Sequence, residues 1–179
     1  MQMEYLGEKA FKIKTKTMTV IIEPCESCKK QTADIVVTSK GLAGGVKGPV
    51  KREKVFVIDR PGEYEMGEVE IRTMPVNGDM ITIIYAEDVN LVHLGSVKVL
   101  TEKQMGELST AEVLMMPVDG KKELVSKLAP LLLIPMGYES GSEVDKFVSD
   151  GGFDNVRRTK KLSLKQADLP EDMQVVIMG

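Results

Sequence analysis

Residues 80–95 read MITIIYAEDVNLVHLG, and the chain changes character at this stretch. Two runs rich in Ile, Val and Leu, Met80–Tyr85 and Val89–Leu94, flank the polar pair Glu87–Asp88, which is the pattern of two strands joined by a tight turn. Before these runs the chain contains short strand-like segments, and after Gly95 helical stretches alternate with buried-type strands. This order predicts an α/β fold.

The first half contains further short runs of Val, Ile and Thr bounded by turn residues, each too short for a helix. They lie at residues 11–14, 18–22, 35–38, 55–58 and 68–73. With the two strands of residues 80–94, they predict an antiparallel meander. Residues 41–54 form a long segment without a clear period, which we expect to be a loop.

The second half begins with Thr101, which is a good helix-capping residue, and Gln104 follows it at the spacing of a capping box. Buried-type strands are expected at 113–116, 131–134 and 175–178, and helices near 121–128 and 142–149. We therefore predict one layered α/β domain over residues 1–179, with helices on the outside of its sheets.

Composition limits the function. The 179 residues are 42% hydrophobic and 4% aromatic, with a formal net charge of -3, so general binding to nucleic-acid backbones is not expected. No stretch approaches the ~18 apolar residues of a membrane span, and the first residues lack the pattern of a signal peptide. We expect a cytoplasmic protein that does not bind membranes.

Read in order, several segments resemble the metallo-β-lactamase fold hydrolases, in particular a group of small zinc-dependent hydrolases. The segments that carry the resemblance are Tyr5–Gly7, Ile22–Pro24, Ala33–Ser39, Pro61–Glu65 with Gly67, His93–Gly95, Leu100–Gln104, Met115–Val118 and Ile134–Met136. In this resemblance Pro61–Gly67 is a turn, and Tyr5–Gly7 belongs to the opening strand. The implied fold is a four-layer αββα sandwich, and the implied chemistry is zinc-dependent hydrolysis.

The zinc ligands of that family are absent from the matching positions. The family's metal loop, His-x-His-x-Asp-His, follows the Ser or Thr that ends a strand, and its ligand positions are occupied here by Lys40, Leu42, Gly44 and Gly45. The family's bridging Asp is replaced by Ser96, and a late His by Gly137. Zinc needs about three or four N, O or S donors, so the resemblance implies a degenerate site with no metal cofactor and no catalytic residue.

Two other features could supply metal ligands. Cys25 and Cys28 form a Cys-x-x-Cys pair, which could be half of a metal site or a redox-active dithiol, and His93 is the single histidine of the chain. A relocated zinc site would combine them with a carboxylate such as Asp34 or Glu26. We favour structural thiols, without a permanent disulfide in a reducing compartment, and a histidine in the core.

Two basic clusters remain. They comprise Lys47, Lys51, Arg52 and Lys54 in the long loop, and Arg157, Arg158, Lys160 and Lys161 near the end. Single-strand binding sites interleave such charges with aromatic residues, which are absent here, so a solvated basic face is favoured over a nucleic-acid contact.

The favoured hypothesis is a pseudoenzyme: a metallo-β-lactamase-like domain that acts as a non-catalytic binding or assembly module, with a protein partner or a second copy of itself. The alternative is a metal-dependent hydrolase of an ester, amide or phosphodiester that uses the relocated site. We further expect a protein cation to fill the vacated site, with Lys40 close to Glu23 or Glu63.

Overall fold

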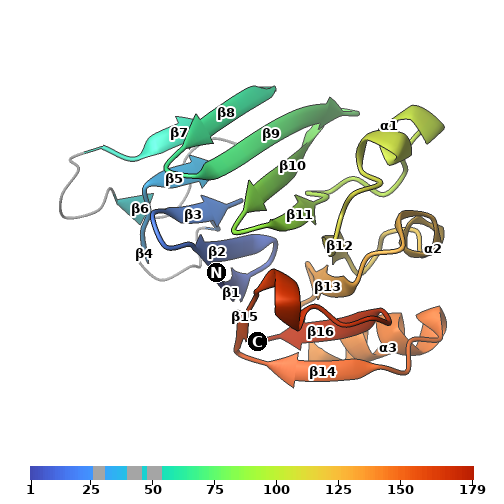
Figure 1. Ribbon diagram of the computed structural model, residues 1–179. Helices are drawn as coiled ribbons and strands as arrows, with labels where there is room; N and C mark the ends of the chain where they lie inside the picture. The colour runs from blue at the N-terminus through green and yellow to red at the C-terminus, as the bar shows by residue number, and fades with distance from the viewer. Residues whose placement is uncertain (26–30, 40–45, 48–53) are drawn as a thin grey trace.

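The computed structural model describes residues 1–25, 31–39, 46–47 and 54–179. In these residues two mixed β-sheets lie face to face (Figure 1). The six-stranded sheet has the order β15 (Lys161–Ser163), β1 (Gln2–Gly7), β2 (Ala10–Lys14), β3 (Thr19–Ile22), β5 (Ile35–Val37) and β7 (Phe56–Ile58). The eight-stranded sheet has the order β14 (Val156–Thr159), β16 (Gln174–Met178), β13 (Leu132–Met136), β12 (Val113–Pro117), β11 (Val89–His93), β10 (Asp79–Ala86), β9 (Val69–Val76) and β8 (Gly62–Met66).

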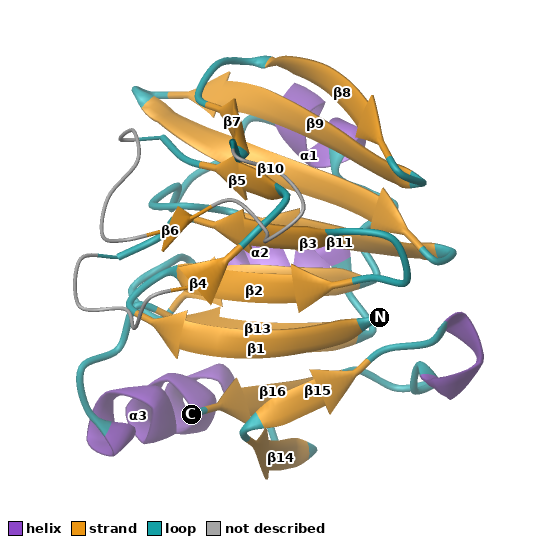
Figure 2. Ribbon diagram, turned by 90° about the vertical axis from the view of Figure 1, so that its left-hand side faces the viewer, coloured by secondary structure: helices purple, strands orange, loops and turns teal. Residues whose placement is uncertain are grey.

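Three α-helices cover the outer face of the eight-stranded sheet: α1 (Glu102–Glu107), α2 (Glu123–Leu128) and α3 (Gly141–Gly151) (Figure 1). On the outer side of the six-stranded sheet, the short strands β4 (Gln31–Thr32) and β6 (Val46–Lys47) pair with each other (Figure 2). A 3-10 turn, η1 (Gln166–Asp168), precedes the last strand. The predicted α/β sandwich is confirmed.

Alternation along the strands places one apolar core between the sheets and a second one under the helices. In β9, Val69 and Ile71 point into the inter-sheet core, whereas Glu70 and Arg72 are exposed on the other face. The helix-side core includes Phe147 of α3. The two cores fix the sheets relative to each other, so that residues at the strand ends meet along a common edge.

The pairing of the first-half strands differs from the predicted simple meander. Strands β1 to β3 and β8 to β11 are antiparallel, but β3 pairs with β5 and β5 with β7 in parallel. Parallel neighbours need a crossover connection longer than a hairpin turn, and the segments before and after β5 are long enough to provide it. The period of a strand gives no information about the direction of its neighbour.

The predicted turn at residues 61–67 is also corrected, because Gly62–Met66 forms the edge strand β8. Its alternation of exposed Glu63 and Glu65 with inward Tyr64 is that of a strand with one face in water. Charged side chains on an edge strand oppose pairing with another chain, and this explains its polar sequence.

The helix that begins after Thr101 has the predicted capping box. The Thr101 side chain accepts a hydrogen bond from the Gln104 amide at 3.3 Å, and the Gln104 side chain accepts one from the Thr101 amide at 2.9 Å. In the part of the chain that the structure describes, every helix is too short or too polar to cross a membrane.

Candidate functional site

Two of the predicted site positions lie at the same edge of the eight-stranded sheet. Ser96 follows β11 and Gly137 follows β13, and both strands run parallel to β12 between them. The carboxyl ends of parallel strands therefore bring the two positions to one side of the fold, the side at which α/β sheets commonly bind ligands. Lys40, Leu42, Gly44 and Gly45 lie outside the described residues.

A lysine that the sequence analysis did not identify lies between these positions. The Lys9 ammonium donates a hydrogen bond to Ser96 Oγ. A Cβ added to Gly137 would lie 3.8 Å from Lys9 Cε, so the lysine stem passes along the glycine. We call Lys9, Ser96 and Gly137 the Lys9 cluster.

The backbone of the β1–β2 turn is fixed to the same edge. The Gly137 amide donates to the Glu8 carbonyl at 2.6 Å, and the Tyr5 hydroxyl donates to the same carbonyl at 2.6 Å. Burial raises the pKa of Tyr5 to about 12, so its hydroxyl stays protonated as this bond requires. The turn that carries Lys9 is thus held by both sheets.

His93 is the other link between the sheets. Its side chain is 0% exposed, and its ring lies edge-on to Phe11 at 5.9 Å between centroids. Nε2 donates to the Lys9 carbonyl at 2.8 Å, and Nδ1 accepts a hydrogen bond from the Gly95 amide at 3.1 Å. Burial lowers the pKa of His93 to about 4, so the neutral imidazole is the form that fits. Both ring nitrogens are used within the protein.

Asp79 fixes the loop that presents Ser96. Its carboxylate accepts hydrogen bonds from the Ser96 amide at 3.0 Å and from the Met80 amide at 2.8 Å. Gly95, between His93 and Ser96, has a φ of +60° and packs against this carboxylate and the Met80 carbonyl. The backbone of Ser96 is therefore held in place by these contacts.

The cysteines differ from expectation. Cys25 is buried and its sulfur is disulfide-bonded, whereas we expected a reduced thiol. The chain's other cysteine, Cys28, lies outside the described residues. A Cys-x-x-Cys spacing brings two sulfurs within bonding reach, which is the physical reason that such pairs oxidise readily. A disulfide sulfur carries no thiolate charge, so it is a poor zinc ligand.

The two carboxylates proposed to pair with Lys40 have other neighbours. Glu23 accepts a hydrogen bond from the Ser39 amide at 2.7 Å, directly before the segment that the structure does not describe. Glu63 lies on the outer face of the eight-stranded sheet, with its oxygen 3.7 Å from Arg72 Nε. The pairing of Lys40 stays a prediction.

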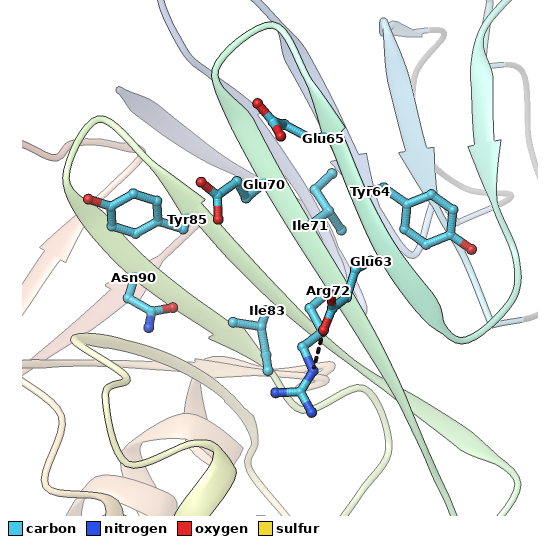
Figure 3. A pocket seen from close by; sticks show the side chains of 9 residues that line it. All are labelled: Glu63, Tyr64, Glu65, Glu70, Ile71, Arg72, Ile83, Tyr85 and Asn90. Carbon is cyan, nitrogen blue, oxygen red and sulfur yellow. Dashed lines mark ion pairs between the residues drawn. The ribbon is translucent and has the colours of Figure 1, made fainter.

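A separate groove of about 680 Å³ runs along that outer face (Figure 3). Glu65, Glu70 and Tyr85 line it, and Figure 3 shows Glu63 and Arg72 pointing toward each other at one side. Tyr85 lies near one end of β10, and Asp79, beside Ser96, is at the other end. The groove is therefore distinct from the Lys9 cluster.

The basic cluster near the end of the chain lies at one edge of the fold. Arg157, Arg158, Lys160 and Lys161 are exposed, Arg158 pairs with Asp145, and Lys161 Nζ lies 3.7 Å from a Glu4 oxygen. Of the first cluster, Lys51 and Arg52 lie outside the described residues, and Lys54 is exposed.

The residues of the Lys9 cluster do not fit a zinc ion. A glycine has no side-chain donor, an ammonium repels a dication, and one neutral hydroxyl is insufficient. Within the described ranges, no group of three or more His, Cys, Asp or Glu residues could hold a metal. The sequence of residues 40–45 contains none of these four residue types either.

The chain is similar to a known family and to several solved structures. The family described as the beta-lactamase superfamily domain matches residues 2–137. A proposed Zn-dependent hydrolase of the metallo-β-lactamase superfamily from Thermotoga maritima is 27% identical, with a TM-score of 0.82 over 99% of this chain and 98% of that one. No curated protein matches the sequence.

Two more distant structures share only the fold. CmlA, a diiron β-hydroxylase from Streptomyces venezuelae, is 9% identical with a TM-score of 0.62, over 92% of this chain and 54% of that one. The metallo-β-lactamase fold protein YhfI from Bacillus subtilis is 9% identical with a TM-score of 0.58, over 98% of this chain and 95% of that one.

Proposed function

The chain belongs to the beta-lactamase superfamily, and from that premise we propose that it is a member that works without zinc, as a non-catalytic binding or assembly module. Its partner would be another protein or a second copy of the chain. Family membership fixes the architecture, whereas function depends on the side chains at the site.

The observation that carries this proposal is the Lys9 ammonium beside Ser96 and Gly137. At an effective dielectric constant of about 20, two unit charges 4 Å apart repel by about 4 kcal/mol, and a dication doubles this value. A zinc ion at the same place would face this repulsion without the His and Asp ligands that offset it in a metal-binding site. The chain's own cation and a metal ion are therefore alternatives.

The relocated zinc site is the less favoured function. It would draw on Cys25, Cys28 and His93, but both His93 nitrogens are hydrogen-bonded and Cys25 is disulfide-bonded. Binding zinc there would require breaking the His93 bridge between the sheets and reducing the disulfide. Hydrolysis of an ester, amide or phosphodiester through a metal-activated water would need both changes.

Protein purified without chelator is expected to contain less than about 0.1 equivalent of zinc, iron or manganese per chain. The measurement is plasma mass spectrometry of the folded protein, with the double variant Cys25→Ser, Cys28→Ser as its control. The expected values are the same for the two proteins. One equivalent of metal in the wild type would overturn the proposal, and its loss from the double variant would establish the relocated site instead.

A further inference from the structure

The Lys9 ammonium has unused hydrogen-bonding capacity. It carries three N–H donors, and Ser96 Oγ is its one hydrogen-bond partner among the described residues, none of which forms an ion pair with it. The contact with Ser96 is partly buried. The binding of an anion to a partly desolvated cation is favourable when the cation has only a neutral partner.

Ser96 offers a further donor beside the ammonium. Its oxygen accepts the bond from Lys9, and no acceptor among the described residues takes its hydroxyl proton. Asp79 holds the Ser96 amide, and the hydrogen bond from Lys9 places the Ser96 hydroxyl beside the ammonium. Two N–H groups of Lys9 and the O–H group of Ser96 therefore have no acceptor among the described residues.

From these contacts we infer that Lys9 and Ser96 form a binding site for a small oxyanion, a phosphate or a carboxylate. Such an anion would accept hydrogen bonds from the free N–H groups of Lys9 and from the O–H group of Ser96, at the edge where β11 and β13 end. The inference deepens the proposed function, because it names the chemical class that a metal-free site would bind.

Hydrogen bonds hold the backbone around the Lys9 cluster in place before a ligand binds. His93 fixes the Lys9 backbone, and Gly137 both fixes Glu8 and leaves space beside the lysine stem. Asp79, an acidic group bonded to the loop that presents Ser96, accepts two backbone amide bonds, so its charge is already compensated in part. Donors that are fixed before binding lose little conformational entropy when the ligand arrives.

The test is a titration with inorganic phosphate at constant ionic strength, followed by the amide NMR signals of Gly95, Ser96 and Gly137. A second titration uses acetate, which distinguishes a phosphate site from a carboxylate site. Wild-type protein is expected to show saturable shifts with at least one of the two anions. Shifts that grow linearly with both anions, as in general screening, would overturn the inference.

Two variants show whether the cluster is responsible. Lys9→Met is expected to abolish the saturable shift, and Ser96→Ala to weaken binding about tenfold, as for a lost hydrogen bond to a charged group. Lys12→Met is the matched control, because its ammonium lies in the same hairpin and also has a neutral partner, Gln31 Oε1 at 2.9 Å. It should bind as the wild type does.

Unchanged binding by Lys9→Met would refute the site, and so would unchanged binding by Ser96→Ala if the lysine variant does not fold. Metal analysis of the same sample separates this inference from the proposed function. Bound zinc would contradict the proposed function. If the protein is metal-free but shows no Lys9-dependent binding of anions, only the inference is contradicted.

Discussion

Acidification from pH 6.5 to 4 is expected to lower the free energy of unfolding by about 3 kcal/mol through His93 alone. Burial lowers the pKa of His93 in the folded state from 6.5 to about 4. Between these values the unfolded chain binds a proton that the folded protein does not, so stability falls as the pH falls. The His93 contribution is fully present above pH 6.5 and constant again below the folded-state value.

The measurement is urea denaturation of wild type and His93→Gln at several pH values between 7 and 4. Glutamine keeps an amide donor and acceptor but does not titrate, so the difference between the two proteins isolates His93 from the carboxylates that also titrate in this range. The wild type should lose its stability advantage on acidification. Parallel pH profiles would mean that the histidine is not held neutral between the sheets.

Replacing Gly95 by alanine is expected to lower the free energy of unfolding by about 3 kcal/mol. At a φ of +60°, the added Cβ would lie 2.8 Å from the Met80 carbonyl oxygen and 2.9 Å from Asp79 Oδ1. Backbone must shift to relieve the first contact. The shift would also disturb the hydrogen bond from the Ser96 amide to Asp79, and therefore the Lys9 cluster.

Gly78→Ala is the matched control for that substitution. Gly78 also has a positive φ, +83°, but a Cβ there would meet no atom within 4 Å. Gly78→Ala should lower the free energy of unfolding by about 1 kcal/mol, the cost of the left-handed conformation alone. Chemical denaturation of the two variants gives both values. Equal losses would show that the close packing of Gly95 against Asp79 does not contribute.

The sequence predicted most strands because apolar alternation is local. Residues 80–94 read as a hairpin, and β10 and β11 form it with the turn at Glu87 and Asp88. The buried strands of the second half are likewise found as β12, β13 and β16. Strand β14 was missed, since Val156–Thr159 has a nearly all-exposed pattern without apolar alternation.

By itself, the sequence determined which residues stand at the six positions where the family resemblance places metal ligands, because the identity of a residue needs no coordinates. These positions are Lys40, Leu42, Gly44, Gly45, Ser96 and Gly137. Only the tertiary structure decided that Lys9 reaches Ser96, 87 positions away, and that His93 is neutral and bridges the sheets. It also decided the parallel pairing of β3, β5 and β7. Contacts and protonation depend on burial and on neighbours that are remote along the chain, whereas a local sequence pattern reports only the period and turn preference of its own segment.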